Sequence, residues 1–153
     1  YKDQTKLQTI EDILEEMKKK LEAEQASTQS VEEISPPTSL LWLYYYLALH
    51  LAHPTHPSPN YARSLDLLDT ALRHTPTLPE IYMAKAMVLK RAGDADGAAR
   101  WMEKARLLDG QDRFINGKTG KYWLRAGEVE KASAVFGLFT KVGQLVCWTC
   151  WTI

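Results

Sequence analysis

Apolar residues recur every three or four positions near the start of the chain, which is the spacing of one face of an amphipathic helix. They are Leu7, Ile10, Ile13, Leu14, Met17 and Leu21. Acidic residues lie before the lysine run 18–20, an order that suits the helix dipole. This pattern predicts a helix over residues 7–24. The Ser/Thr-rich stretch 25–39 contains Pro36 and Pro37, which end a helix, so residues 1–39 are expected to form one helix and a loop.

The pattern changes after residue 39, where small and large apolar residues repeat with a period of 34. The pairs that repeat in phase include Ala86 and Gly120, Gly93 and Gly127, Ala98 and Ala132, and Met102 and Phe136. This period is typical of tetratricopeptide repeats (TPRs), in which two antiparallel helices form each hairpin. The sequence therefore predicts an all-α, TPR-like solenoid with three helical hairpins, over about 40–76, 79–110 and 113–143, and an atypical tail over 144–153.

Small residues at these repeating positions predict close contact between helices. Ala86 or Gly120 in the first helix of a hairpin, and Ala98 or Ala132 in the second, let two backbones approach while larger side chains fill the space beside them. Glycines at positions 93 and 127 mark the turns inside two hairpins. The full set expected to serve this repeat packing is Ala48, Ala86, Gly93, Ala98, Met102, Ala105, Gly120, Gly127, Ala132 and Phe136.

The first hairpin departs from the period. Its helices fit only with about four extra residues in the turn between them, and the segment AHPTHPSPN (52–60) accommodates these because its prolines prevent helix continuation. His50, His53 and His56 lie three residues apart, a spacing that can bring imidazoles to one metal ion. However, Pro54 and Pro57 break the helix that such a site requires, and no carboxylate or cysteine follows nearby. We therefore expect a solvated loop and no metal site.

Composition and charge are those of an ordinary globular protein. Of 153 residues, 45% are apolar and 25% are charged, and the formal net charge is zero, which gives no indication of nucleic acid or membrane as a partner. Residues 1–38 carry five basic and nine acidic residues, whereas residues 39–153 carry fourteen and ten. An anionic ligand is therefore expected to bind the second part. The longest apolar run, residues 40–52, is too short to span a membrane.

The sequence contains no catalytic motif that we recognise, so we expect a protein that is not an enzyme. It lacks Walker, nucleophile-elbow and nucleotide-binding glycine patterns. Cys147 and Cys150 form a C-x-x-C pair, but a zinc ribbon needs a second pair and a redox site needs a βαβ context. The low number of cysteines is consistent with a reducing compartment such as the cytoplasm. The start at Tyr1 indicates that the chain is a fragment. In the string DADG, Asp94 is expected to cap a helix.

Basic residues gather on two neighbouring predicted hairpins. Lys118, Lys121 and Arg125 lie at positions i, i+3 and i+7 of one helix. The preceding hairpin supplies Lys85, Lys90, Arg91 and Arg100. Cations that converge in this way can hold a polyanion through charge-assisted hydrogen bonds. The alternative is a solvated basic face that pairs with carboxylates such as Asp94 and Glu128.

Four segments closely resemble one family. They are PPTSLLWLYYYLA (36–48), HTPTLPEIYMAKA (74–86), AGDADGAARWMEKARLLDGQDRFINGKT (92–119) and KYWLRA (121–126). The likeness is to the large auxiliary subunit of the eukaryotic N-terminal acetyltransferase A (NatA) complex, and this chain looks like a central fragment of such a subunit. The string from AARWM to DRFIN is far more specific than a generic TPR. The insertion in the first turn and the tail after Gly143 depart from the family.

The resemblance implies a non-catalytic role. In that family an all-helical TPR solenoid wraps the small catalytic acetyltransferase subunit, organises its active site and brings it to the ribosome for co-translational acetylation of nascent chains. Acetyl-CoA is therefore expected on the catalytic partner. The family also binds inositol hexakisphosphate, and the basic and aromatic positions that match here are Lys90, Arg100, Lys118, Lys121 and Tyr122. No other cofactor, no membrane and no specific nucleic acid are expected.

The main alternative is a generic TPR adaptor that binds a peptide or a chaperone tail in its groove. Such adaptors place Lys, Arg and Asn on successive first helices. Lys85 and Asn116 fit that pattern, but the first repeat offers only Tyr44 and Tyr45. An RNA-binding helical repeat is a weaker alternative, because the chain has no overall basic excess.

Overall fold

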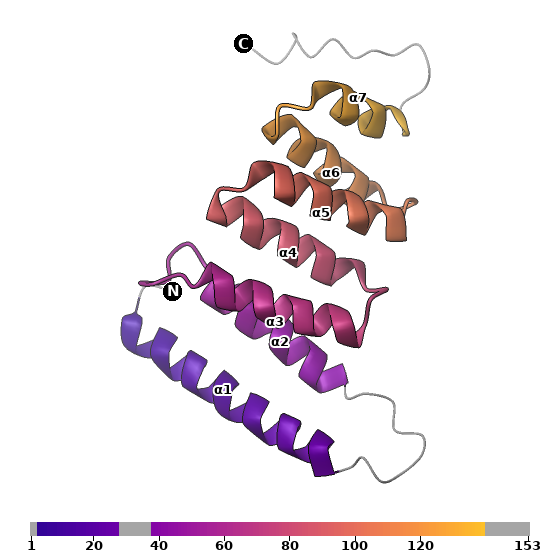
Figure 1. The fold of residues 1–153 in the computed structure, drawn as a ribbon. Helices are drawn as coiled ribbons and strands as arrows, with labels where there is room; N and C mark the ends of the chain where they lie inside the picture. The colour runs from indigo at the N-terminus through magenta and orange to yellow at the C-terminus, as the bar shows by residue number, and fades with distance from the viewer. Residues whose placement is uncertain (1–2, 28–37, 140–153) are drawn as a thin grey trace.

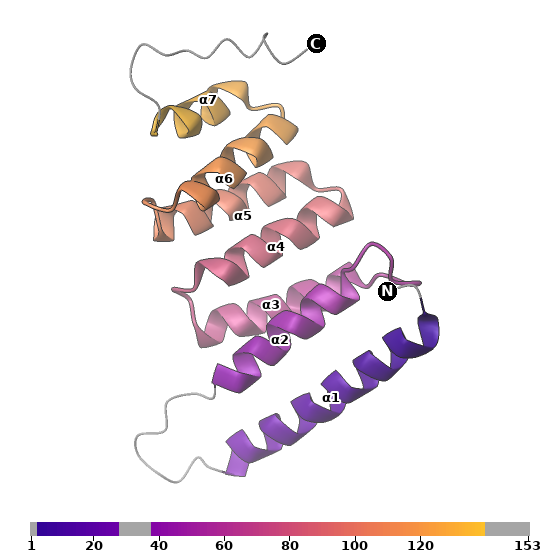
Figure 2. The same cartoon turned by 180° about the vertical axis from the view of Figure 1, so that it is seen from behind.

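The computed structural model describes residues 3–27 and 38–139, and these contain seven helices and no strand. The helices are α1 (Gln4–Ser27), α2 (Thr38–Leu51), α3 (Tyr61–His74), α4 (Pro79–Ala92), α5 (Ala95–Leu108), α6 (Arg113–Arg125) and α7 (Val129–Gly137). Each helix packs mainly on its neighbours in sequence, so the chain runs from α1 at one end of a stack to α7 at the other (Figures 1 and 2). The prediction of an all-α, TPR-like solenoid is confirmed. The tail 144–153, with its C-x-x-C pair, lies outside the described residues.

Local sequence sets the turns between paired helices. Gly93 ends α4 with a φ of 96°, a left-handed conformation that glycine adopts without strain. Asp94 then caps α5, because its side chain accepts the backbone N–H of Gly97 at 2.7 Å. The expected helix cap is thus confirmed. Gly127, with a φ of 81°, occupies the equivalent turn between α6 and α7.

The small repeating residues lie between the helices. Those with a Cβ, namely Ala48, Ala86, Ala98, Ala105 and Ala132, are at most 1% exposed, as is Met102. Gly120 on α6 faces the ring of Phe136 on α7, and a Cβ there would lie only 2.4 Å from the tip of the ring. A side-chain hydroxyl also lies in this buried interior, since Ser64 Oγ donates to the carbonyl of Ala48 at 2.7 Å. Small side chains therefore allow helix contacts that larger ones would block.

Helix α1 packs against α2 through only part of the apolar surface of α1. Leu7 is 3% exposed, and Leu14 and Leu21 pack on the core of the first hairpin. Ile10, Ile13 and Met17 lie on another face and are 43%, 52% and 47% exposed. Polar contacts help to hold α1 in place: Tyr44 Oη donates to Glu22 at 2.8 Å, and Arg63 of α3 pairs with Glu11 and Glu15. None of the helices in the described part of the chain is long and apolar enough to cross a membrane.

Candidate functional site

Four basic side chains gather at the end of α4 and along α6. Lys90 and Arg91 lie in the last turn of α4, whereas Lys118 and Arg125 belong to α6. Partial burial lowers the pKa of Lys90, and the positive charges of Arg125, Arg91 and Lys118 lower it further. These charges are therefore close enough to repel one another, and a bound anion would relieve the repulsion. We call Lys90, Arg91, Lys118 and Arg125 the basic cluster.

Neighbouring groups position the members of the basic cluster. On α6, Lys118 and Arg125 are seven residues apart and so lie on one face of the helix. Lys118 Nζ lies 4.4 Å from the centre of the Phe114 ring. On α4, Arg91 Nη1 donates to the carbonyl of Ala52, just after α2, at 2.9 Å. The cluster thus depends on contacts within α6 and on the stacking of α4 against the first hairpin.

Tyr122 lies on α6 between Lys118 and Arg125, the two members of the basic cluster on that helix. Lys90 Nζ lies 5.6 Å from the centre of the Tyr122 ring. Burial raises the pKa of the Tyr122 phenol, although the charges of Arg125 and Arg91 oppose this effect. The phenol therefore stays protonated near neutral pH and can donate a hydrogen bond to a bound anion.

Carboxylates do not neutralise the basic cluster. Within residues 3–27 and 38–139, none of its members forms an ion pair. The solvated-face interpretation named Asp94 and Glu128 as partners. However, Asp94 caps α5, and Glu128 lies 3.3 Å from Lys131 Nζ. The expected pairings are wrong, because Asp94 caps its own helix and Glu128 pairs with Lys131 in the first turn of α7.

The cluster differs from the set chosen from the sequence. Lys85 is buried on another face of α4, where it bonds to Asp69 and lies 4.0 Å from the centre of the Trp101 ring. Arg100 is exposed on α5 and pairs with Asp96, one turn earlier. Neither Arg100 nor the exposed Lys121 is among the charges that lower the pKa of Lys90.

Arg91 and Arg125 are the members of the basic cluster that the matched family positions omit. The spacing of Arg125 from Lys118 already indicated that these two residues share a face. The position of Arg91, in contrast, depends on its bond to Ala52 in the preceding hairpin, a contact that no local pattern reveals.

The expectation of a solvated loop is wrong for two of the three histidines. His50 is 3% exposed, and the His56 side chain is 8% exposed. Helix α1 runs beside them and brings Glu11 Oε2 to 3.7 Å from His56 Nε2. His53 instead bonds within the loop, to Thr55 Oγ1 at 2.8 Å. Sequence reasoning found no carboxylate because Glu11 is distant along the chain.

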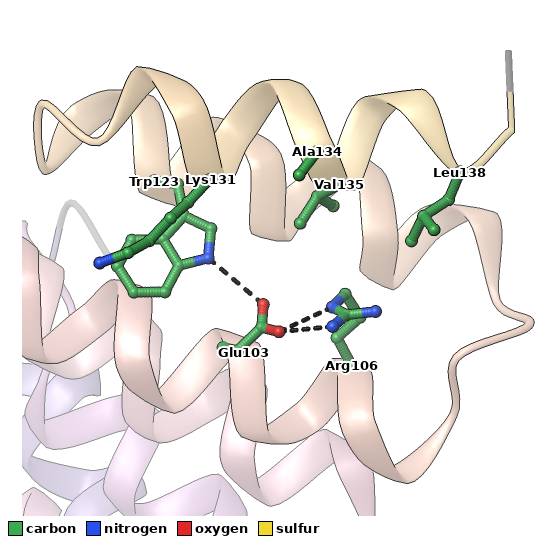
Figure 3. Close-up of a pocket in the computed structure, with 7 residues that line it drawn as sticks. All are labelled: Glu103, Arg106, Trp123, Lys131, Ala134, Val135 and Leu138. Carbon is green, nitrogen blue, oxygen red and sulfur yellow. Dashed lines mark hydrogen bonds and ion pairs between the residues drawn. The ribbon is translucent and has the colours of Figure 1, made fainter. Parts of the chain in front are cut away.

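A hollow of about 400 Å³ lies between α5, α6 and α7 (Figure 3). The Glu103 carboxylate lies inside it, where it accepts from Trp123 Nε1 at 3.2 Å and from Arg106 Nε at 3.0 Å. The bond from Arg106 lowers the pKa of Glu103; partial burial opposes this, and the Trp123 bond supports it. Because these groups satisfy one another, the hollow is better suited to joining two hairpins than to binding a ligand.

Comparison with known proteins identifies the family. The family model for the auxiliary subunit of N-terminal acetyltransferase A matches residues 1–146. The human protein named N-alpha-acetyltransferase 16, NatA auxiliary subunit, is 41% identical over 111 residues, which are 72% of this chain and 12% of that protein. The Arabidopsis thaliana NatA complex auxiliary subunit NAA15 is 38% identical over 109 residues, or 71% and 12% of the two chains. The chain thus spans about an eighth of the length of these relatives.

Solved structures agree with this comparison. A structure of Naa15/Naa10 bound to HypK-THB matches with a TM-score of 0.77 and 32% identity, over 94% of this chain and 20% of the other. A structure of MamA matches with a TM-score of 0.53 and 15% identity, over 82% of this chain and 64% of the MamA chain. This match shows only a shared fold. Together with the family match, these findings confirm the resemblance drawn from the sequence: the chain belongs to the family of N-terminal acetyltransferase A auxiliary subunits.

Proposed function

We propose that this chain is part of a non-catalytic auxiliary subunit that binds and organises the catalytic subunit of an N-terminal acetyltransferase complex. The observation that carries the proposal is the match of 94% of the chain to a structure of Naa15 with Naa10. A stack of helical hairpins suits this role, because each hairpin extends a scaffold whose shape is set by packing between neighbours. Acetyl-CoA is then bound by the catalytic partner and not by this chain.

A graft tests this role directly. Residues 38–139 replace the corresponding segment of Naa15, and the chimaera is expressed together with Naa10. We expect the two to co-purify and to transfer acetyl groups from acetyl-CoA to a peptide that begins with Ser. The control graft is the matching segment of MamA, which shares the fold at 15% identity.

The two grafts distinguish a family-specific scaffold from a generic TPR adaptor. Helical content, measured by circular dichroism, must first show that both chimaeras are folded. Capture of Naa10 by the graft from this chain, and not by the MamA graft, supports the proposal. A folded graft from this chain that does not capture Naa10 contradicts it. Equal activity of both grafts also contradicts it, because any helical spacer would then be sufficient.

We also propose that the basic cluster and Tyr122 bind inositol hexakisphosphate. Four uncompensated positive charges and a phenol that can donate a hydrogen bond suit a ligand with several phosphate groups. The test is calorimetric titration of the full chain with inositol hexakisphosphate, comparing Lys118→Gln with Lys121→Gln. Both variants remove one exposed lysine from α6, but only Lys118 belongs to the cluster.

We expect Lys118→Gln to weaken binding about tenfold or more, since a hydrogen bond to a charged group contributes about 1.5–3 kcal/mol. Lys121→Gln should change the affinity much less. Equal losses would show that the ligand responds only to total charge, and absence of binding to the wild type would refute the site.

The family resemblance also supports a setting for the whole protein. We propose that it acts in the cytoplasm and joins its catalytic partner at the ribosome, where nascent N termini emerge. Sedimentation of the complete protein with ribosomes, before and after deletion of residues 38–139, tests whether this segment contributes to that association.

A further inference from the structure

One carboxylate and two imidazoles meet where α1 passes the first hairpin. Glu11 comes from α1, His50 from the last turn of α2, and His56 from the proline-rich turn that follows. One potential ligand atom from each residue lies within 4.8 Å of the other two. The two rings are nearly perpendicular, with an angle of 82° and 5.4 Å between their centres. Helix α1 thus brings a carboxylate to two histidines at the end of α2 and in the turn that follows it.

The surroundings hold these side chains in position. His50 has a hydrogen bond to the backbone of Leu7 on α1, and histidines that bind metals commonly use their second ring nitrogen in this way. Arg63 Nη1 lies 3.4 Å from Glu11 Oε1, while the other oxygen, Oε2, faces His56. The Arg63 charge is itself balanced by an ion pair with Glu15.

We propose that Glu11, His50 and His56 bind a divalent transition-metal ion, zinc in the first instance. Two nitrogens and one carboxylate oxygen are a common zinc ligand set, with water in the fourth position. In a tetrahedral site with bonds of about 2.1 Å the ligand atoms lie about 3.4 Å apart, so closure here needs side-chain movements of roughly 1 Å. Binding through His56 Nε2 also requires the ring proton to be on Nδ1. Nδ1 then no longer accepts the long 3.3 Å hydrogen bond from the Ser58 N–H.

The site would tie three segments together. His56 belongs to the insertion that breaks the 34-residue period, so the proposal concerns this chain and does not rest on the proposed family function. A bound ion would fasten α1 and the turn to the end of α2. It would thereby stabilise the folded state by mass action.

The test uses the full chain, purified without a histidine tag and stripped of metal. Cys147→Ser and Cys150→Ser remove the thiols as competing ligands. Cobalt(II) serves as a spectroscopic probe, zinc(II) is titrated calorimetrically, and melting is followed with zinc or with EDTA. We expect one ion per chain, visible cobalt bands without sulfur charge transfer, displacement of cobalt by zinc, and a higher Tm with zinc.

Variants identify the ligands. Glu11→Gln and His56→Gln put a polar side chain of similar size in place of each ligand, so both should fold, and each should weaken zinc binding at least about tenfold. His53→Gln is the matched control, because it removes a histidine from the same turn that lies outside the three-residue group. If the chain that carries only the two cysteine substitutions does not bind zinc, the proposal is overturned. Binding that survives both ligand variants, or is lost equally in His53→Gln, overturns it as well.

Discussion

Gly117 and Gly120 lie one turn apart on α6, yet alanine should have opposite effects at the two positions. A Cβ at residue 117 would meet nothing within 4 Å, whereas a Cβ at residue 120 would lie 2.4, 2.6 and 2.8 Å from ring atoms of Phe136. In a helix interior alanine is favoured over glycine by about 1 kcal/mol. Gly117→Ala should therefore raise the free energy of unfolding by up to about that amount.

At residue 120 the same gain is opposed by steric overlap with Phe136. Overpacking a close contact costs about 1–3 kcal/mol. The change in helix propensity is common to both variants, so the difference between their stabilities isolates the overlap. We expect Gly120→Ala to be less stable than Gly117→Ala by about 1–3 kcal/mol.

Urea unfolding of the full chain, followed by circular dichroism, measures this difference. Phe136→Leu provides a second test, because it removes the ring atoms of Phe136 that a Cβ at residue 120 would overlap. The double variant should recover part of the loss caused by Gly120→Ala, with a coupling of about 0.5–3 kcal/mol. If Gly120→Ala is as stable as Gly117→Ala, the close contact between α6 and α7 does not exist and the packing argument fails.

Substitutions at three further positions test other contacts. Asp94→Ala should lower stability by about 0.5–2 kcal/mol by removing the cap of α5, while Asp94→Asn should cost little; thermal melting compares them. Ser64→Ala should cost about 1 kcal/mol in urea unfolding, because it removes a buried bond to the Ala48 carbonyl. The bond from Arg106 lowers the pKa of Glu103 in the folded state below its unfolded value, near 4.5. The Glu103 carboxylate therefore stabilises the fold fully above the unfolded pKa, and this contribution is lost as the pH falls through the lower folded pKa. Glu103→Gln should therefore flatten the fall in stability over this acidic range, and an unchanged pH profile would refute the role of the pair.

Local signals explain why much of the fold could be predicted. Gly93 needs only the left-handed φ that ends α4, and Asp94 needs only the next backbone N–H groups. The 34-residue period likewise depends on contacts between adjacent hairpins, which repeat with the sequence. The helices and the turns between them could therefore be predicted from residues that are close in the chain.

The candidate sites were harder to predict because their side chains meet across elements. Lys85 and Lys90 are five residues apart, which separates them by about 140° around α4. This geometry alone places Lys85 away from the basic cluster, but its actual partners, Asp69 and Trp101, come from α3 and α5. Glu11 reaches His56 only because α1 lies along the first hairpin, and no periodic pattern records that placement.

One bond connects the two proposed sites. Arg91 of the basic cluster donates to the carbonyl of Ala52, and the turn that begins there leads to His56. In a solenoid, distant repeats are nearly independent, because each contacts only its neighbours. We therefore expect the effects of His56→Gln and Lys118→Gln on stability to add within about 0.3–0.5 kcal/mol, since no shared partner joins them.

Arg91→Gln should behave differently. It releases the same turn that positions His56, so its combination with His56→Gln should deviate from additivity by at least about 0.5 kcal/mol. Double-mutant cycles in metal-free buffer, with Lys118→Gln as the matched charge control, measure both combinations. Additivity in both cycles would show that the Arg91 bond carries no coupling. Equal coupling in both would show that charge alone, and not the bond to Ala52, links the turn to the basic cluster.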